Sequence, residues 1–242
     1  GAKLALGAET AKLAEPILAD AVRAETAPRP TSGGGRPPPD LSKLMALMGE
    51  AAAGKRDPLE VRRDIGAFAM GAETMDEDAF IATFGRSFAT LPDDAWPERG
   101  YACTAVDAET GEFMLWTKES GVGVTRAVAS SCSVPGVYPP ITLKGRRYID
   151  GGMRSGTNAD MARGHDKVVV VALAIPGAAA ALDAEIRTLK DAGSQVQRIT
   201  PDAAALGAMG PNLMDFRKRA AAARAGLAQG AAAADELRAF WA

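Results

Sequence analysis

Residues 145–153 read GRRYIDGGM, and they decide the fold expected of this chain. Within them, residues 147–149 are typical of a β-strand, because Tyr and Ile favour the pleated conformation. The preceding residues 144–146, Lys-Gly-Arg, predict a tight turn from a first strand over residues 141–143. This stretch therefore indicates a β-hairpin that ends on an acidic side chain.

That acidic side chain is Asp150, and two glycines follow it. Gly151 and Gly152 carry no bulk that could shield the carboxylate, and they let the backbone pass close to another element or take a positive φ. We therefore expect Asp150 to be exposed at a sheet edge or in a cleft, as a reactive group often is. The alternative is a plain β-turn, since Asp-Gly is a common turn dipeptide.

Other strands and helices are expected on either side of this hairpin. Residues 101–106 and 112–117 are apolar, strand-like runs joined by a turn-rich segment, which predicts a second hairpin. Residues 167–175 form a continuous β-branched run of the kind that is buried on both faces of a parallel sheet. A helix over residues 182–192 and a strand over residues 195–200 follow. The alternation predicts an α/β fold with helices flanking a mostly parallel sheet.

The N-terminal part of the chain has a helical pattern. Apolar positions recur at helical spacing over residues 2–25 and again, in two or three pieces, over residues 41–84. We expect one domain spanning residues 1–242, because its length suits a single large core. Within it, residues 1–96 form a mainly helical, cap-like region and residues 97–242 form the α/β region.

Composition limits the classes of function. The net charge is −2, which gives no field that would attract a phosphate backbone, so nucleic acid is not an expected partner. Only Cys103 and Cys132 are present, without the spacing of a metal or redox pair, and we expect neither a metal nor an organic cofactor. The longest apolar stretch, residues 168–176, is about half of what a membrane-spanning helix needs. A reducing cytoplasm is the expected compartment.

Two segments together resemble the patatin-like phospholipase family over most of residues 100 to 175. The first, residues 127–140, is a helical run followed by Pro-Gly-x-x-Pro-Pro, and the second is the strand with Tyr-x-Asp-Gly-Gly. The resemblance, which is strongest to bacterial members, implies a three-layer sandwich and a serine acyl hydrolase. It implies that Asp150 is the aspartate of a Ser-Asp dyad, supported by Gly151 and Gly152. The usual Asn-Pro after the glycines is replaced here by residues 157–159, Thr-Asn-Ala.

The family's serine lies in a Gly-x-Ser-x-Gly elbow, and its oxyanion loop follows the first strand. Neither motif occurs in this sequence. Because the elbow runs directly into a helix, as Gly1 and Ala2 do here, we interpret Gly1 as the last glycine of the elbow. The alternative is an unrelated start. Under this interpretation the N-terminal strands are missing, and the chain alone is inactive and needs that N-terminal fragment of the same protein as a partner.

The resemblance also implies a lipid or other carboxylic ester as substrate and leaves room for peripheral contact with a membrane. Its rival is a non-catalytic member of the same fold, a pseudoenzyme or interaction module in which the Asp-Gly-Gly stretch is only a turn. Nucleotide binding is disfavoured, because no Gly-x-Gly-x-x-Gly joins a strand to a helix.

Other candidate groups have a simpler structural interpretation. His165 could complete a Ser-His-Asp triad, but it stands in a short turn before a buried strand, where a polar residue is common. Ser130, Ser131 and Ser133 have no elbow context, so we interpret them as helix-end hydroxyls near the site. The glycine run 33–35 imitates an oxyanion loop, but it follows a helix rather than a strand.

Overall fold

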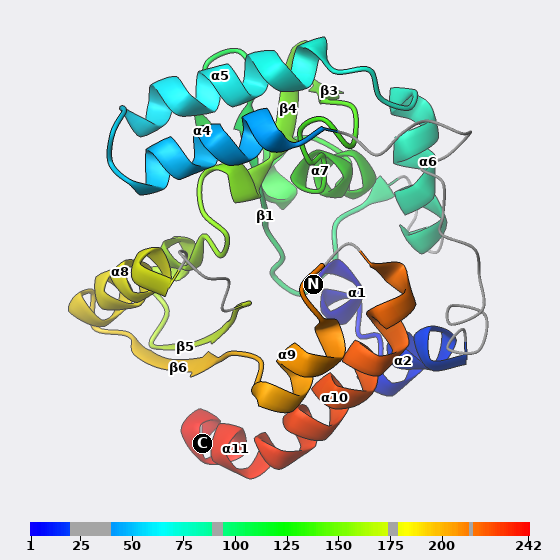
Figure 1. Cartoon of the computed structure of the whole chain (residues 1–242). Coiled ribbons are helices and arrows are strands. Elements are labelled where there is room, and N and C mark those ends of the chain that lie inside the picture. The colour runs from blue at the N-terminus through cyan, green and yellow to red at the C-terminus, as the bar shows by residue number, and fades with distance from the viewer. Residues whose placement is uncertain (20–39, 89–93, 174–178, 213–214) are drawn as a thin grey trace. The chain divides into compact units, whose positions relative to one another are not determined.

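The computed structural model shows helices alternating with short strands (Figure 1). It describes residues 1–19, 40–88, 94–173, 179–212 and 215–242. The glycine run 33–35, which we compared with an oxyanion loop, and residues 20–25 of the predicted helix over residues 2–25 lie outside the described residues.

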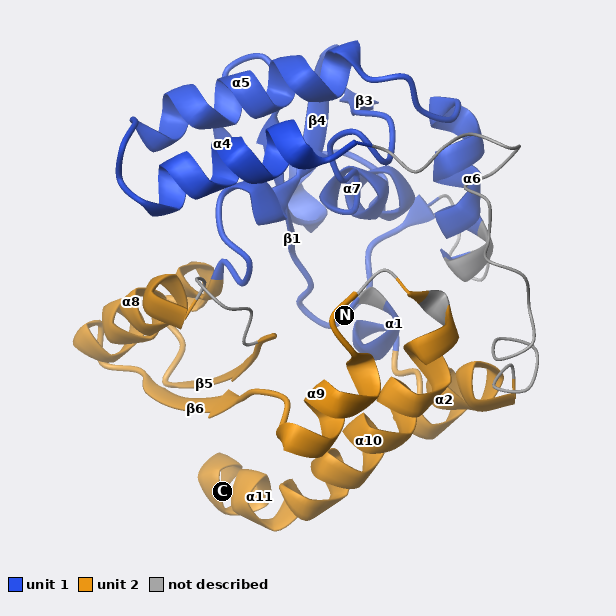
Figure 2. Ribbon diagram, in the orientation of Figure 1, with its two compact units in different colours: residues 1–6, 38–158 blue, residues 7–37, 159–242 orange. Residues whose placement is uncertain are grey.

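The chain divides into two compact units (Figure 2). Unit 1 comprises residues 1–6 and 38–158, and unit 2 comprises residues 7–37 and 159–242. The predicted division between residues 96 and 97 falls inside unit 1 and does not separate the two units. The single domain over residues 1–242, incomplete at its N-terminus, stays a prediction.

Unit 1 contains a four-stranded antiparallel sheet in the order β2-β1-β4-β3. Both predicted hairpins are confirmed, one formed by β1 with β2 and the other by β3 with β4. The central pair is β1 and β4, which lie far apart in sequence. The strands are β1 (Cys103–Asp107), β2 (Phe113–Trp116), β3 (Ile141–Leu143) and β4 (Arg146–Asp150).

The two hairpin turns are fixed by local chemistry. At the β1–β2 turn, Oδ1 of the buried Asp107 accepts the N–H groups of Glu109 and Thr110 at 3.0 and 2.9 Å, and Oδ2 lies 2.7 Å from Nε of Arg146. At the β3–β4 turn, Lys144 and Gly145 have φ values of 50° and 75°. Two successive positive φ values are typical of the tight turn that matches the twist of a hairpin.

Helices cover both faces of this sheet, because successive residues of a strand point to opposite sides. Val106 and Ile149 pack in one core with α4 (Ser42–Ala52) and α5 (Pro58–Gly71). Their chain neighbours, Ala105 and Tyr148, pack in a second core with α6 (Glu77–Phe88) and α7 (Val124–Ser131). The short helix α1 (Ala2–Ala5) is followed by Leu6, which packs against this second core. Unit 1 is therefore a three-layer arrangement of helices, sheet and helices.

Unit 2 contains the parallel pair of strands β5 (Lys167–Val171) and β6 (Gln195–Ile199), joined through α8 (Ala179–Asp191). Val168 and Val170 pack against Leu182 and Leu189 of α8. Val171 is 74% exposed, so the expectation that this strand is buried on both faces is wrong at its end. The other α-helices in the described part of unit 2 are α2 (Thr10–Ala19), α9 (Ala203–Met209), α10 (Arg219–Ala232) and α11 (Ala234–Trp241).

The α/β class is confirmed, but the mostly parallel sheet is not seen in the described residues. Short turns can only join antiparallel neighbours, whereas a parallel pair needs a crossover such as α8. The larger sheet is built from two such short-turn hairpins and is antiparallel throughout. Among the described helices none is long and apolar enough to cross a bilayer.

Gly66 allows α5 to lie directly against the β1–β2 turn. A Cβ at this position would stand 1.8 Å from the carbonyl oxygen of Ala108. Because that oxygen belongs to backbone, the helix itself would have to move. The spacing between α5 and the sheet therefore depends on the missing side chain at Gly66.

We predict that Gly66→Ala lowers the free energy of unfolding by about 1–3 kcal/mol, the usual cost of overpacking a core. The matched control is Gly49→Ala in the neighbouring helix α4, where a Cβ would meet no atom within 4 Å. That change is expected to stabilise the protein by roughly 0.5–1 kcal/mol through helix propensity. Urea unfolding of both variants checks the prediction, which equal effects of the two substitutions would contradict.

Candidate active site

Asp150 is the last residue of β4, and its position is fixed on both the main chain and the side chain. It pairs with Ala105 of β1, and its N–H donates to the carbonyl oxygen of Ser133 at 3.0 Å. Its Oδ1 accepts the N–H of Gly152 at 2.7 Å, at the start of a 3-10 turn over residues Gly151–Met153. We expected Asp150 at a sheet edge or in a cleft. The strand that carries it, β4, is not an edge strand, because it lies between β1 and β3.

The two glycines after Asp150 leave space for neighbouring groups. Neither has a positive φ, so they do not form the tight Asp-Gly turn of a hairpin. A Cβ on Gly151 would lie 2.1 Å from Oγ1 and 2.5 Å from the backbone oxygen of Thr104 on β1. A Cβ on Gly152 would lie 3.0 Å from Oδ1 of Asp150. Gly151 thus permits the close approach to β1, and Gly152 keeps the carboxylate uncrowded.

The Asp150 carboxylate is half-buried, and this changes its acidity. Burial raises the pKa of Asp150, while the hydrogen bond from the Gly152 N–H lowers it by a smaller amount. A buried carboxylate loses hydration in its charged form, which is why burial favours the protonated form. The Asp150 carboxylate is therefore a stronger base than an exposed aspartate.

Two cysteines and a tyrosine lie in the same neighbourhood. Burial, and secondly the negative charge of Asp150, raise the pKa of Cys132 to about 11. Burial likewise raises the pKa of Cys103 to about 12, although a hydrogen bond from Tyr101 opposes it. Both thiols are therefore protonated near neutral pH and are not activated nucleophiles.

The beginning of the chain, Gly1, lies within unit 1 close to this neighbourhood. A Cβ on Gly1 would lie 3.2 Å from the ring of Tyr101. The amino group of Gly1 also lowers the pKa of Cys132, against the effect of Asp150. The charges of Gly1 and Asp150 therefore both reach the same thiol.

Of the three serines near the end of α7, Ser130 and Ser133 have hydroxyls that are hydrogen-bonded to backbone oxygens. Ser130 is fully buried, donates to the carbonyl oxygen of Ala127 at 2.7 Å and accepts from Nε1 of Trp116 at 3.1 Å. Ser133 is also fully buried and donates to the carbonyl oxygen of Pro139. Ser131 is half-buried at the end of α7. The hydroxyls of Ser130 and Ser133 are committed to backbone oxygens.

His165 belongs to unit 2, where it is exposed in the turn before β5. Its carbonyl oxygen accepts a hydrogen bond from the hydroxyl of Ser194 at 2.7 Å. This contact ties the turn to the residue that precedes β6. The turn position agrees with the structural interpretation of His165. Within the described ranges, no group of three or more His, Cys, Asp or Glu side chains is arranged to hold a metal ion.

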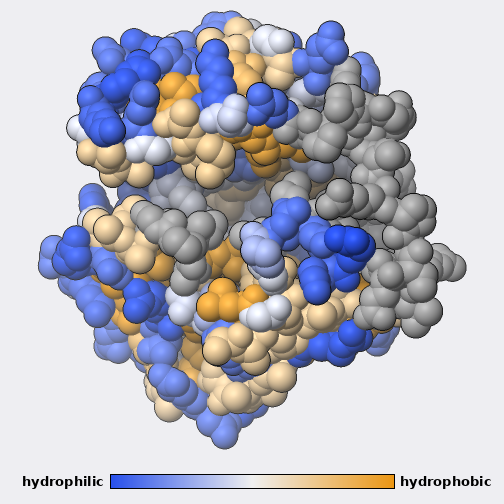
Figure 3. All heavy atoms as spheres, in the orientation of Figure 1, coloured by the Kyte–Doolittle hydropathy of each residue, from blue (hydrophilic) through white to orange (hydrophobic). Residues whose placement is uncertain are grey.

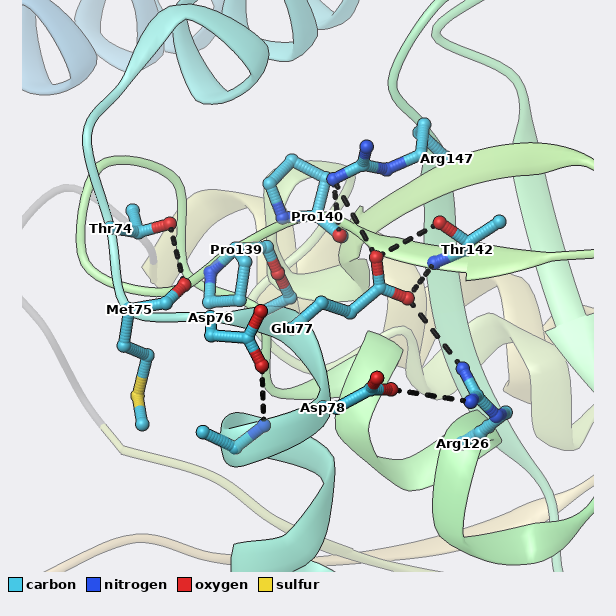
Figure 4. A network of polar contacts seen from close by, with 12 residues as sticks. Thr74, Met75, Asp76, Glu77, Asp78, Arg126, Pro139, Pro140, Thr142 and Arg147 are labelled. Atoms are coloured by element: carbon cyan, nitrogen blue, oxygen red, sulfur yellow. Dashed lines mark hydrogen bonds and ion pairs between the residues drawn. The ribbon is translucent and has the colours of Figure 1, made fainter.

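A polar network centred on Glu77 joins two helices and two strands of unit 1 (Figure 4). Glu77 stands at the start of α6 and accepts from the N–H and hydroxyl of Thr142 on β3 at 2.6 and 2.9 Å. Its carboxylate also lies 3.6 Å from Arg126 of α7 and 3.8 Å from Arg147 of β4. The network connects α6 and α7 with the hairpin that carries Asp150.

Sequence reasoning did not identify Glu77 or Asn158 as parts of this region. Glu77 looks like an ordinary acidic residue in the first turn of a helix, which is favourable without any partner. Asn158 is buried and bonds to the backbone of the Asp-Gly-Gly loop. The sequence offered two signals at this position, the replacement of the family's usual Asn-Pro at residues 157–159 and the suitability of Asn158 as a helix N-cap, and neither indicated a contact with Gly151.

Comparison with known families agrees with this geometry. Residues 12–163 match the family described as patatin-like phospholipase, and this range includes Asp150 and both glycines. The matched range covers well over half of the chain and defines a lipid acyl hydrolase class. The chain belongs to the patatin-like phospholipase family. A comparison with curated proteins gave no match.

We predict that Asp150→Asn raises the melting temperature at neutral pH. Burial raises the pKa of Asp150, so the ionised carboxylate opposes folding once the pH exceeds its folded pKa. Below the ordinary aspartate pKa the side chain is neutral in both the folded and unfolded states, and the advantage of Asn should vanish. Melting curves between pH 3.5 and 8, with the range chosen to bracket the ordinary aspartate pKa of about 3.9, measure this difference.

The matched control is Asp166→Asn, at an exposed aspartate in unit 2. Its effect on the melting temperature should be small and should not follow the pattern of the Asp150 variant. A melting temperature of Asp150→Asn that stays at or below that of the parent protein across the whole range would contradict the prediction.

Proposed function

We propose that the intact protein hydrolyses carboxylic esters of lipids through a Ser-Asp dyad in which Asp150 is the base. The observation that supports this most is the environment of the Asp150 carboxylate. It is half-buried, its Oδ1 accepts a hydrogen bond from the Gly152 N–H, and burial raises its pKa. Perturbed carboxylates in defined hydrogen-bond geometry are typical of catalytic bases. Membership of the patatin-like phospholipase family supports the same class of reaction.

The reaction has two steps in this proposal. The serine hydroxyl attacks the ester carbonyl carbon, its proton passes to Asp150, and that proton then leaves on the departing alcohol as the C–O bond breaks. Water next attacks the acyl-serine, giving one proton to Asp150, which returns it to the serine oxygen as the carboxylic acid is released. Because Oδ1 accepts from Gly152, we assign the proton transfer to Oδ2.

We further propose that the nucleophilic serine precedes Gly1 in the intact protein. Gly1 lies against Tyr101, and its amino group and the Asp150 carboxylate act on the same Cys132 thiol. A residue just upstream of Gly1 would therefore begin close to the proposed base. The hydroxyls of Ser130 and Ser133, by contrast, are held by backbone oxygens.

The N-terminal strands and the oxyanion loop belong to the same proposed upstream fragment. Apolar patches interrupt the hydrophilic surface in Figure 3, and the large exposed apolar side chains include Val171 and Leu173 at the end of β5. An isolated pair of parallel strands is unusual, since parallel sheets are normally covered on both faces. These features support a sheet that continues in further strands. A lipid substrate would place the protein at a membrane surface, so peripheral contact is part of this proposal.

The rival is a non-catalytic family member, and one observation favours it. The sequence contains no Gly-x-Ser-x-Gly and no glycine-rich loop after a strand. In that case the buried Asp150 would only fix the loop after β4. The coding sequence upstream of Gly1 distinguishes the two, because an in-frame Gly-x-Ser-x-Gly there supports the hydrolase.

We predict that the upstream-extended protein reacts with a fluorophosphonate probe and hydrolyses a short-chain ester, and that the 242-residue chain alone does neither. Asp150→Asn in the extended protein should lower turnover by about 10²–10⁴-fold, the usual contribution of a general base. Asp166→Asn serves as the control and should leave turnover unchanged. If the 242-residue chain hydrolyses the ester and loses this activity on Asp150→Asn, the proposal of an upstream serine is wrong. If the extended protein keeps full turnover with Asp150→Asn, the proposal of a Ser-Asp dyad is wrong.

A further inference from the structure

We propose that Asn158 is a positioning residue that fixes the peptide unit facing the Asp150 carboxylate. This inference rests on the proposed function, because it assigns Asn158 a role through Asp150. Asn158 is eight positions beyond Asp150 in sequence, yet its side chain bonds to the first residue after it. None of the substrate atoms need touch Asn158 for this role.

The side chain of Asn158 uses both of its polar ends. Nδ2 donates to the carbonyl oxygens of Gly151 and Ser155 at 3.1 and 2.9 Å, and it lies 3.4 Å from Oγ1 of Thr104. Oδ1 accepts from Nη1 of Arg154 at 2.8 Å. An amide can donate and accept hydrogen bonds at the same time. A carboxylate of the same shape would present only acceptors to these two carbonyl oxygens.

The backbone at Asn158 is also unusual. Its φ is 48°, in the left-handed region that Asn tolerates better than most side chains. Its N–H donates to the hydroxyl oxygen of Ser155 at 3.1 Å, and the residue is only 9% exposed. The loop from Asp150 to Asn158 is therefore closed on itself by a buried side chain.

The connection to Asp150 runs through one planar group. The carbonyl of Gly151 and the N–H of Gly152 belong to the same peptide unit, which is rigid and planar. Asn158 binds the oxygen end of this unit, with the Arg154 N–H at 3.0 Å on the same oxygen, and Asp150 Oδ1 accepts from the nitrogen end. Rotation of the unit would break the bonds at both ends. Asn158 thus restrains the donor that orients the proposed base.

Three charged or titratable groups are relevant to a pH test of this idea. Cys132, at the end of α7, feels the charge of Asp150 and is protonated near neutral pH, and the Gly1 amino group, which acts on the same thiol, is free only in the 242-residue chain. The guanidinium of Arg154 lies 4.6 Å from the ring centre of Phe113 and stays charged at every pH tested. We therefore assign a change in the acid limb of the pH profile to Asp150 itself.

The test compares Asn158→Gly with Lys144→Gly. Glycine accepts a positive φ at both positions, and Lys144, with φ 50°, lies in the β3–β4 turn away from the loop. Only Asn158→Gly removes the amide that holds the Gly151 carbonyl. In the upstream-extended protein we expect kcat to fall about 10-fold or more with KM changed less than about two-fold, since misplacement by about 1 Å can cost 10²-fold.

A second measurement does not require activity. Loosening of the Gly152 N–H removes a bond that lowers the pKa of Asp150, so this pKa should rise in Asn158→Gly. Carbon-13 NMR titration of the Asp150 carboxyl group in the 242-residue chain measures it directly. The acid limb of kcat/KM in the extended protein should move to higher pH in the same direction, and Lys144→Gly should show neither change.

The outcomes separate the two proposals. If the Asn158→Gly variant folds and has the same kcat and the same Asp150 pKa as the parent protein, the proposed role of Asn158 is wrong. This conclusion does not depend on the result for Asp150→Asn. Full turnover by Asp150→Asn overturns the proposed function instead. If Asn158→Gly does not fold, Asn158→Asp keeps an acceptor for Arg154 but loses the donors to Gly151 and Ser155. It should show the same loss of kcat, and parental kcat there overturns the inference.

Discussion

The pairing of β1 with β4 is the constraint on which unit 1 depends. It aligns Ala105 with Asp150 and Val106 with Ile149, so adjacent residues of each strand contribute to opposite cores. The pairing closes two separate hairpins into one sheet, and both helical layers pack on it. Because the hairpin partner β3 pairs only with residues earlier in β4, the position of Asp150 is set by this contact together with the hydrogen bond from its N–H to the carbonyl oxygen of Ser133.

This placement has an energetic consequence. A carboxylate at the end of an interior strand loses hydration, and one hydrogen bond from Gly152 compensates only part of that loss. Residues that reduce stability in this way are often retained because a reaction needs their perturbed chemistry. The Glu77 carboxylate contacts Thr142 of β3 and Arg147 of β4, and the Asn158 amide binds the Gly151 carbonyl that directly follows β4.

The sequence permitted the two hairpins and the crossover through α8 to be predicted, because turn residues and β-branched runs act locally. The strand order was not predictable in the same way. Nothing in residues 103–107 specifies β4 rather than another strand as a neighbour. The contact between Glu77 and Thr142 spans 65 positions, and a Glu near a helix start is common for local reasons. Asn158 was hidden for a similar reason, since Asn also suits caps and turns without any distant partner.

The Asp-Gly-Gly stretch shows how the same residues satisfy two different physical requirements. In a hairpin turn, glycine is needed because φ is positive, and the neighbouring strands then pair with each other. Here neither Gly151 nor Gly152 has a positive φ, and the chain continues into a 3-10 turn instead of a partner strand. Gly151 is required by the backbone of Thr104, and a side chain at position 152 would crowd the carboxylate of Asp150. Close contacts, and not the turn conformation that Asp-Gly commonly adopts, therefore account for the two glycines.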